Sequence, residues 1–164
     1  MTTDSSLILR LAQPEDCGVL FELIQGLAEY EKLTDAVTGS ASQLKEHLFG
    51  SRKYAEAILA EFAGEAVGFA LFFPNYSTFL TQPGIYLEDL FVFKEHRQKG
   101  IGKALLTKVA SIAVERNCGR LEWSVLNWNE PAKVFYRHMG AEILEDWQIC
   151  RVTGDGLKKL GVRS

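Results

Sequence analysis

Residues 97–103, Arg-Gln-Lys-Gly-Ile-Gly-Lys, could bind an anion where a strand-type segment is followed by a helix-type one. The first backbone N–H groups of a helix have no partner within the helix, so they form a site for phosphate. Glycines at 100 and 102 would let a ligand approach bare backbone. The alternative is that they only permit a tight turn. Ala104 and Leu105 exclude a P-loop and a dinucleotide fingerprint, which need Ser or Thr and a third glycine at these positions.

Two acidic residues, Glu88 and Asp89, interrupt the otherwise apolar run from Ile85 to Phe93. A carboxyl group in such a strand is expected to be partly buried, and desolvation then raises its pKa. Because side chains alternate between the faces of a strand, Asp89 is expected on the face opposite Glu88. We select Glu88 as the candidate proton acceptor. The alternative is that its carboxylate only pairs with a nearby Lys or Arg.

Hydrophobic periodicity and turn signals define the elements that must position these residues. The expected strands are 7–11, 54–62, 66–73, 85–93 and 120–126, with a final β region at 141–153 that turns near 144–146. The expected helices are 14–30, 41–49, 101–113 and 130–140, the last with Asn129 as its N-cap, and 74–84 is expected to be a loop. This order indicates an α/β fold with a mixed, mostly antiparallel central sheet flanked by helices.

Composition limits the class of protein. The chain has 164 residues, 47% of them hydrophobic and 24% charged, which is typical of one globular domain over 1–164. A net charge of −3 does not favour a nucleic-acid surface. The longest apolar run, 66–73, is too short to span a membrane, and the start of the chain lacks a signal-peptide pattern. Three widely spaced cysteines predict reduced thiols, and we expect a cytoplasmic protein.

The segment 97–102 resembles the R/Q-x-x-G-x-G/A signature of the GNAT superfamily of acetyl-CoA-dependent N-acetyltransferases. Further segments resemble the diamine and polyamine branch, which includes the spermidine/spermine and thialysine acetyltransferases. These segments are Leu27-Ala28-Glu29-Tyr30-Glu31, Ile85-Tyr86-Leu87-Glu88-Asp89-Leu90, Trp128-Asn129-Glu130-Pro131 and Phe135-Tyr136. The resemblance covers the chain from Ile8 to about Gly156.

The resemblance implies that acetyl-CoA is the co-substrate and that acetyl passes directly to a primary amine. Such an amine, with a pKa of about 10 in water, must lose a proton before it attacks. Glu88 would take or relay that proton, and Tyr136 would act as the general acid toward the departing thiolate. The implied cofactor-binding residues are Leu90, Phe91, Val92, Arg97, Gln98, Lys99, Gly100, Ile101, Gly102, Lys103, Asn129, Pro131 and Ala132.

The same resemblance assigns a set of residues to the amine channel. They are Tyr30, Glu31, Glu88, Glu122, Trp123, Ser124 and Glu145. Several carboxylates suit a polycation, whose ammonium groups must be partly desolvated. Glu122 departs from the residue found in the mammalian polyamine enzymes, so a smaller amine such as thialysine or a short diamine stays open. Family analogy also predicts a homodimer in which the C-terminal strands contribute to the interface.

Three other functions stay open at this stage. The chain could be a GNAT enzyme acting on protein N-termini or lysine side chains, a non-catalytic acyl-CoA-binding module, or a protein that binds nucleotide phosphate. A metal site is not expected, because His47, His96 and His138 lack ligand spacing.

Overall fold

The computed structural model describes residues 6–162, and the chain divides after Leu126 into two compact units, each of which is described by itself. The start of the sequence, 1–5, on which the expectation of no signal peptide rests, lies outside the described residues. Whether the two units form one domain, as the sequence predicts, stays a prediction.

The first unit is built on a five-stranded sheet in the order β1-β2-β3-β4-β5. Its strands are β1 (Leu7–Leu11), β2 (Glu56–Phe62), β3 (Glu65–Ser77), β4 (Gln82–Val92) and β5 (Arg120–Glu122). Neighbours are antiparallel except β4 and β5, which are parallel. The expected α/β class with a mixed, mostly antiparallel sheet is therefore confirmed.

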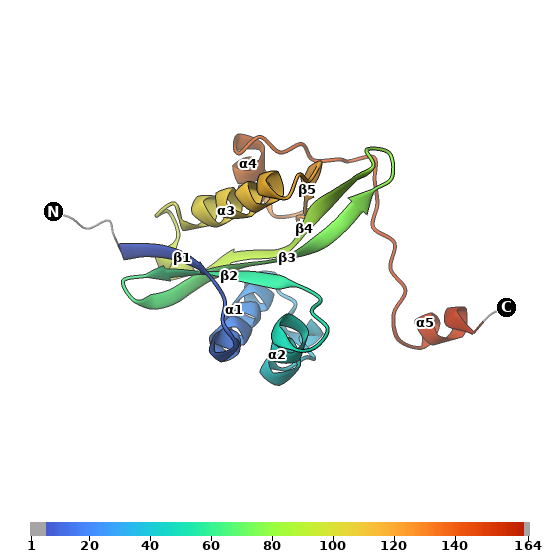
Figure 1. Ribbon diagram of the computed structural model, residues 1–164, viewed down its shortest axis with the longest axis horizontal. Helices are drawn as coiled ribbons and strands as arrows, with labels where there is room; N and C mark the ends of the chain where they lie inside the picture. The colour runs from blue at the N-terminus through green and yellow to red at the C-terminus, as the bar shows by residue number, and fades with distance from the viewer. Residues whose placement is uncertain (1–5, 163–164) are drawn as a thin grey trace. The chain divides into compact units, whose positions relative to one another are not determined.

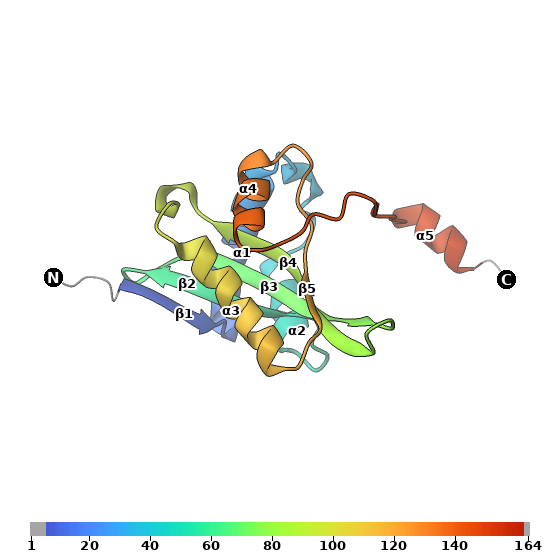
Figure 2. The ribbon, with the colours of Figure 1, turned by 90° about the horizontal axis from the view of Figure 1, so that it is seen from above.

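Helices cover both faces of this sheet. On one face lie α1 (Cys17–Tyr30) and α2 (Ala41–Phe49), and on the other lies α3 (Ile101–Glu115) (Figures 1 and 2). Short 3-10 helices occupy Pro14–Asp16, Thr34–Ala36 and Lys94–His96. The second unit contains α4 (Glu130–His138) and α5 (Gly154–Gly161).

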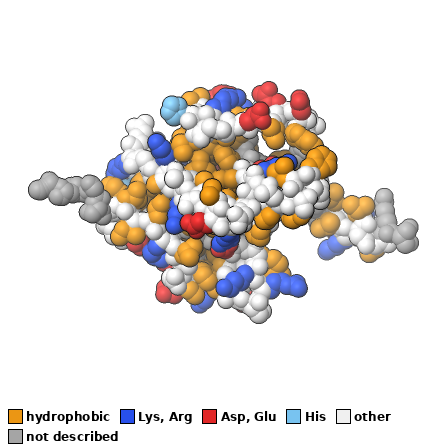
Figure 3. Space-filling model, turned by 45° about the horizontal axis from the view of Figure 1, so that its top comes forward, with side chains coloured by type: hydrophobic (Ala, Val, Ile, Leu, Met, Phe, Trp, Pro, Cys, Tyr) orange, Lys and Arg blue, Asp and Glu red, His pale blue; other side chains and the backbone are white. Residues whose placement is uncertain are grey.

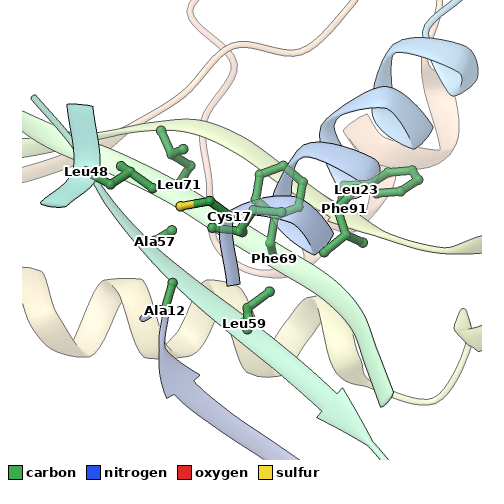
Figure 4. Close-up of a cluster of buried hydrophobic side chains, with 10 residues drawn as sticks. Ala12, Cys17, Leu23, Leu48, Ala57, Leu59, Phe69, Leu71 and Phe91 are labelled. Atoms are coloured by element: carbon green, nitrogen blue, oxygen red, sulfur yellow. The ribbon is translucent and has the colours of Figure 1, made fainter. Parts of the chain in front are cut away.

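Apolar side chains at helical spacing fix α1 and α3 to the sheet. In α3, the buried residues include Ile101, Leu105, Val109 and Ile112, an apolar stripe with the helical spacing from which the sequence predicted a helix over 101–113. On the other face, Leu23 of α1 joins a cluster with Phe69 and Phe91 from the sheet, shown in Figure 4. These two layers hold β4 in the middle of the unit.

Hydrogen-bonded ion pairs of Arg10 connect β1 and β2 to the start of α1. Arg10 Nη1 and Nη2 donate to the carboxylate of Asp16 at 2.7 and 2.9 Å, and Nη2 also donates to Glu61 at 3.1 Å. Asp16 additionally accepts the backbone N–H of Gln13 at 2.6 Å, which closes the turn before α1. The Arg10 guanidinium lowers the pKa of Asp16 through these hydrogen bonds.

Residues 74–84 are not a loop, as the sequence predicted. They extend β3 and β4 into a long hairpin, with Pro74 opposite Ile85 and Ser77 opposite Gln82. The pairing of β2 with β3 already ends at Glu56 and Phe72. Pro74 therefore lies where β3 has a strand on one side only, so its missing N–H breaks no ladder there.

The C-terminal expectations were also partly wrong. β5 covers only Arg120–Glu122 instead of 120–126, and 141–153 contains no strand. A helix that the sequence reading did not predict, α5, follows at Gly154–Gly161. Figure 3 shows hydrophobic side chains on the surface of this helix, and Leu157 and Leu160 are about half exposed.

Candidate active site

The loop before α3 has the backbone form of an anion site. Gly100 is the N-cap of α3, with φ 77° and ψ 8° in the left-handed region, and Gln98 also has a positive φ of 64°. Such turns direct successive N–H groups toward one point, where the positive end of the helix dipole adds to them. A Cβ at Gly100 would meet nothing within 4 Å, so glycine serves the backbone conformation there and the space beside it is open.

The basic residues of this loop have different surroundings. Lys103 is exposed on the first turn of α3, and the ammonium of Lys99 lies 4.6 Å from the centre of the Phe62 ring. Both can add positive charge beside the loop. Arg97, by contrast, contacts residues of β4 and α1.

Arg97 connects three elements of the first unit. Its Nε donates to the backbone carbonyl of Val92 at 2.9 Å. Its guanidinium lies 4.7 Å from the centre of the Tyr30 ring and 5.5 Å from that of Phe91. The side chain therefore joins the phosphate-type loop to the end of β4 and to the C-terminal end of α1.

One edge of β4 is open beside this loop. β5 pairs only with Gly84, Ile85 and Tyr86, so no described strand covers the following residues of β4 on that side. The N–H of Phe93 donates to Val67 on β3, and hydrogen-bonded positions alternate along an antiparallel pair. The N–H groups of Leu90 and Val92 are therefore directed to the open edge, whereas that of Phe91 is directed to β3.

A β-bulge interrupts β4 next to the open edge. Leu87 is opposite Phe72 and Asp89 is opposite Leu71, so Glu88 is the extra residue without a partner on β3. The bulge shifts the alternation by one, and Asp89 consequently shares the α1 face with Leu71 and Phe91. Glu88 is exposed.

This corrects the expectation for the two acids. The partly buried carboxyl group is that of Asp89, not Glu88. Burial, followed by the charges of Glu88 and Glu31, raises the pKa of Asp89 to about 7. The sequence reading assumed an uninterrupted strand, and a one-residue bulge leaves no mark in the hydrophobic pattern.

The C-terminal end of α1 adds two residues near these acids. Tyr30 is the last residue of the helix and Glu31 is its C-cap. Glu31 is partly buried, and desolvation raises its pKa. None of the ion pairs formed by the described residues includes Glu31, Glu88 or Asp89. The end of α1 and the bulge thus form a negative region, to which the negative end of the helix dipole contributes.

The residues assigned around β5 are linked to the β3–β4 hairpin. Asn75 donates its side-chain amide to Glu122 at 3.3 Å. The hydroxyl groups of Tyr86 and Ser124 lie 2.8 Å apart. Trp123, which lies between Glu122 and Ser124 in the sequence, is partly buried.

The other predicted site residues belong to the second unit. Asn129 is the N-cap of α4, as the sequence predicted, and its Oδ1 accepts the N–H of Ala132 at 3.3 Å. Pro131 lies in the first turn of α4. Tyr136 is partly buried, with its ring centre 5.5 Å from that of Phe135. Val134 of the same helix is 61% exposed. Glu145 is exposed in the segment before α5.

The described residues contain neither a cluster of metal ligands nor a membrane-spanning helix. Within residues 6–162, no group of three or more His, Cys, Asp or Glu side chains is placed to hold a metal ion. No helix in the described part of the chain has the length and apolar character needed to cross a membrane.

The sequence model of the Acetyltransferase (GNAT) family matches residues 24–141, which include both the loop before α3 and α4. The chain belongs to the GNAT family.

Named GNAT relatives are similar over nearly the whole chain. A thialysine N-epsilon-acetyltransferase of Bos taurus is 37% identical, over 94% of this chain and 96% of its own length. An L-ornithine N5-acetyltransferase of Arabidopsis thaliana is 34% identical, over 93% of this chain and 86% of its own. The solved structure of an integron cassette protein from the mobile metagenome of V. cholerae has a TM-score of 0.81 and 28% identity, covering 96% of this chain and 99% of that one.

The loop geometry fits the pyrophosphate of the acetyl-CoA that GNAT acetyltransferases use. The positive φ angles of Gln98 and Gly100 and the free start of α3 provide N–H groups, and the open space at Gly100 leaves room for a ligand. The partly buried acid of β4, which the sequence did not single out, is Asp89. Two adjacent acids in an apolar run show that one is buried, but only the register with β3 shows which.

Proposed function

We propose that this GNAT protein is an acetyl-CoA-dependent N-acetyltransferase whose acceptor is a primary amine of a small molecule, of the diamine, polyamine or thialysine type. The observation that carries this proposal is the negative region made by Glu31, Glu88 and Asp89, none of which takes part in an ion pair within residues 6–162. A cationic amine supplies the missing positive charge. The relatives named for thialysine and ornithine acetylation also act on primary amines.

In this proposal the co-substrate lies along the loop and the open edge of β4. The N–H groups of Gln98 to Lys103 would hold the pyrophosphate, with Lys99 and Lys103 adding charge. Asn129, Pro131 and Ala132 would hold the pantetheine arm. When bound, acetyl-CoA supplies a thioester whose carbonyl carbon is attacked by the amine nitrogen.

The residues of the chain then have separate tasks. The N–H groups of Leu90 and Val92, directed to the open edge, would stabilise the negative charge that develops on the carbonyl oxygen. Phe91, whose N–H is directed to β3, would contribute through packing. Tyr136 would donate a proton to the departing thiolate.

The acceptor residues would set the length and charge of the amine. Glu31, Glu88 and Asp89 would bind the reacting ammonium group, with Tyr30 beside them. Glu122, Trp123, Ser124 and Glu145 would line the rest of the channel. Direct transfer needs no nucleophile on the protein, because the amine itself attacks.

A homodimer is part of the proposal, and its support lies in the C-terminal segment. Trp147 and Ile149 are 79% and 72% exposed, and α5 adds further apolar surface. Apolar side chains gathered in this way are typical of a protein interface. Light scattering of the wild type and of Trp147→Ser/Ile149→Ser would show a dimer and its loss; a wild-type monomer would contradict this part.

An amine panel tests the main proposal. The protein is incubated with acetyl-CoA and putrescine, spermidine, spermine, thialysine, ornithine, or peptides with free N-termini and lysines, and release of free thiol is followed. We expect turnover with at least one small amine and none with the peptides. Turnover with peptides alone, or binding of acetyl-CoA without any turnover, would contradict the proposal.

A further inference from the structure

We propose that Asp89, and not Glu88, accepts the proton of the bound amine, and that Glu88 acts on Asp89 through its charge. This inference rests on the proposed function and assigns one step of it to one carboxyl group.

The first argument is the position that the bulge gives to Asp89. In an uninterrupted β4, Asp89 would share a face with Leu87, which lies opposite Phe72 and away from α1. Because Glu88 is the extra residue, Asp89 lies on the α1 face, opposite Leu71 and two residues before Phe91. Glu31 at the end of α1 is close enough for its charge to act on Asp89. The bulge thus places Asp89 between the acceptor residues of α1 and the open-edge N–H groups of β4.

The second argument is that Asp89 is mostly buried and yet available. No described residue donates a hydrogen bond to its carboxyl group or forms an ion pair with it. Among the described residues, the only fully enclosed side-chain polar atom without a partner is Nδ1 of His96. The oxygens of Asp89 therefore keep access to a ligand. A buried carboxylate without a partner is costly, and an ammonium group would supply both charge and hydrogen bonds.

The two charges that act on Asp89, those of Glu88 and Glu31, both favour its protonated form. Glu88 precedes it on β4 and Glu31 faces it from α1, and both charges raise its pKa. The cation Arg97 lies against the neighbouring Phe91 ring, and its other contacts are with Val92 and Tyr30. β3 presents the apolar Leu71.

This environment matches the step that the reaction needs. The proton moves from the ammonium nitrogen to a carboxylate oxygen of Asp89, so one N–H bond breaks, one O–H bond forms and both charges disappear. The proton then leaves to solvent, and the free amine keeps its electron pair for the attack. With its pKa raised from 3.8 to about 7, Asp89 accepts a proton about 10³-fold more readily than an ordinary aspartate. Glu88, being exposed, lacks the burial that contributes most to this effect.

The test compares Asp89→Asn with Glu88→Gln, using the amine that the panel selects and acetyl-CoA at saturation. For the wild type we expect kcat/KM to fall below an apparent pKa near 7. Asp89→Asn should lower kcat by about 10² to 10⁴-fold and abolish this limb. Its deficit should shrink as the pH approaches the pKa of the amine, because solvent then deprotonates the substrate. Glu88→Gln should keep the limb but move it to lower pH, since one charge that raises the pKa of Asp89 is gone.

Matched measurements separate this result from misfolding and from failure of the proposed function. Glu22→Gln removes one exposed acid from the same helix as Tyr30 and should leave the profile unchanged. Each variant is checked for acetyl-CoA affinity, which should not change. An Asp89→Asn enzyme that keeps the limb near pH 7, or a Glu88→Gln enzyme that loses it, would overturn the assignment while leaving the acetyltransferase proposal intact. Absence of turnover with every small amine would remove the proposed function itself.

Discussion

The buried carboxyl group of Asp89 should also make the stability of the protein depend on pH, and this can be measured without a substrate. Its pKa is raised from 3.8 to about 7 in the folded protein by burial and by two neighbouring carboxylates. Between these two values the unfolded chain has lost a proton that the folded chain still holds. The free energy of unfolding therefore falls as the pH rises from about 4 to about 7, and the loss is complete above pH 7.

The size of this effect follows from the shift. About three pKa units correspond to about 4 kcal/mol at pH 8, and the same relation gives about 2 kcal/mol at pH 5. Asn has nearly the same shape as Asp and carries no charge. We therefore expect Asp89→Asn to be more stable than the wild type by up to about 4 kcal/mol at pH 8 and by about half as much at pH 5.

Urea unfolding at the two pH values measures the difference, and the slope m shows whether the unfolding transition stays the same. Glu22→Gln is the control for removing an exposed acid from the surface. A stability gain that is equal at pH 5 and pH 8, or a less stable Asp89→Asn at pH 8, would refute the reasoning that Asp89 is buried without a partner.

Three further predictions concern the elements around the site. Gly100→Ala should lower the free energy of unfolding by about 1 kcal/mol, because its φ of 77° is costly for a residue with a Cβ, and should raise the KM for acetyl-CoA. Gly102→Ala is the control: its added Cβ would meet only one atom, at 4.0 Å, so the variant should not lose stability in urea unfolding. Asp16→Asn should lower the free energy of unfolding by about 2 kcal/mol at pH 7, as measured by urea unfolding. The difference from the wild type should shrink as the pH falls through the lowered pKa of Asp16, because acid then protonates Asp16 and weakens its ion pair with Arg10. Arg97→Ala should raise the KM for both acetyl-CoA and the amine in initial-rate kinetics. Arg97→Gln can still donate a hydrogen bond to Val92, so it should restore the KM for acetyl-CoA more than the KM for the amine. Equal restoration of the two KM values would contradict this.

The sequence predicted those parts of the fold that depend on local patterns. The stripe in α3, the N-cap at Asn129 and the turn between β2 and β3 were all found where periodicity and turn residues placed them. The glycine turn before α3 was predicted as well, because its glycines and the helix that follows lie together in the sequence; that it binds phosphate stays a prediction. These features need little information from distant parts of the chain.

The rest depends on partners far away in the sequence. Pro74 suggested a loop, but β4 pairs with the segment around it and keeps it extended. The exchange of roles between Glu88 and Asp89 depends on the register with Leu71 and Phe72, which one extra residue changes. The strand expected at 141–153 has no partner strand among the described residues, and a strand without a partner cannot satisfy its backbone.

The open edge of β4 has a consequence for solubility. A row of unpaired backbone groups, which we propose to bind the thioester, can equally receive a strand of another molecule, which is how sheets aggregate edge to edge. Arg97 already occupies the carbonyl of Val92, and the bulge at Glu88 twists the edge and places a charge on it. Natural sheets use the same devices to prevent strand addition. The features that prepare this edge for a small ligand therefore also protect it from the next copy of the protein.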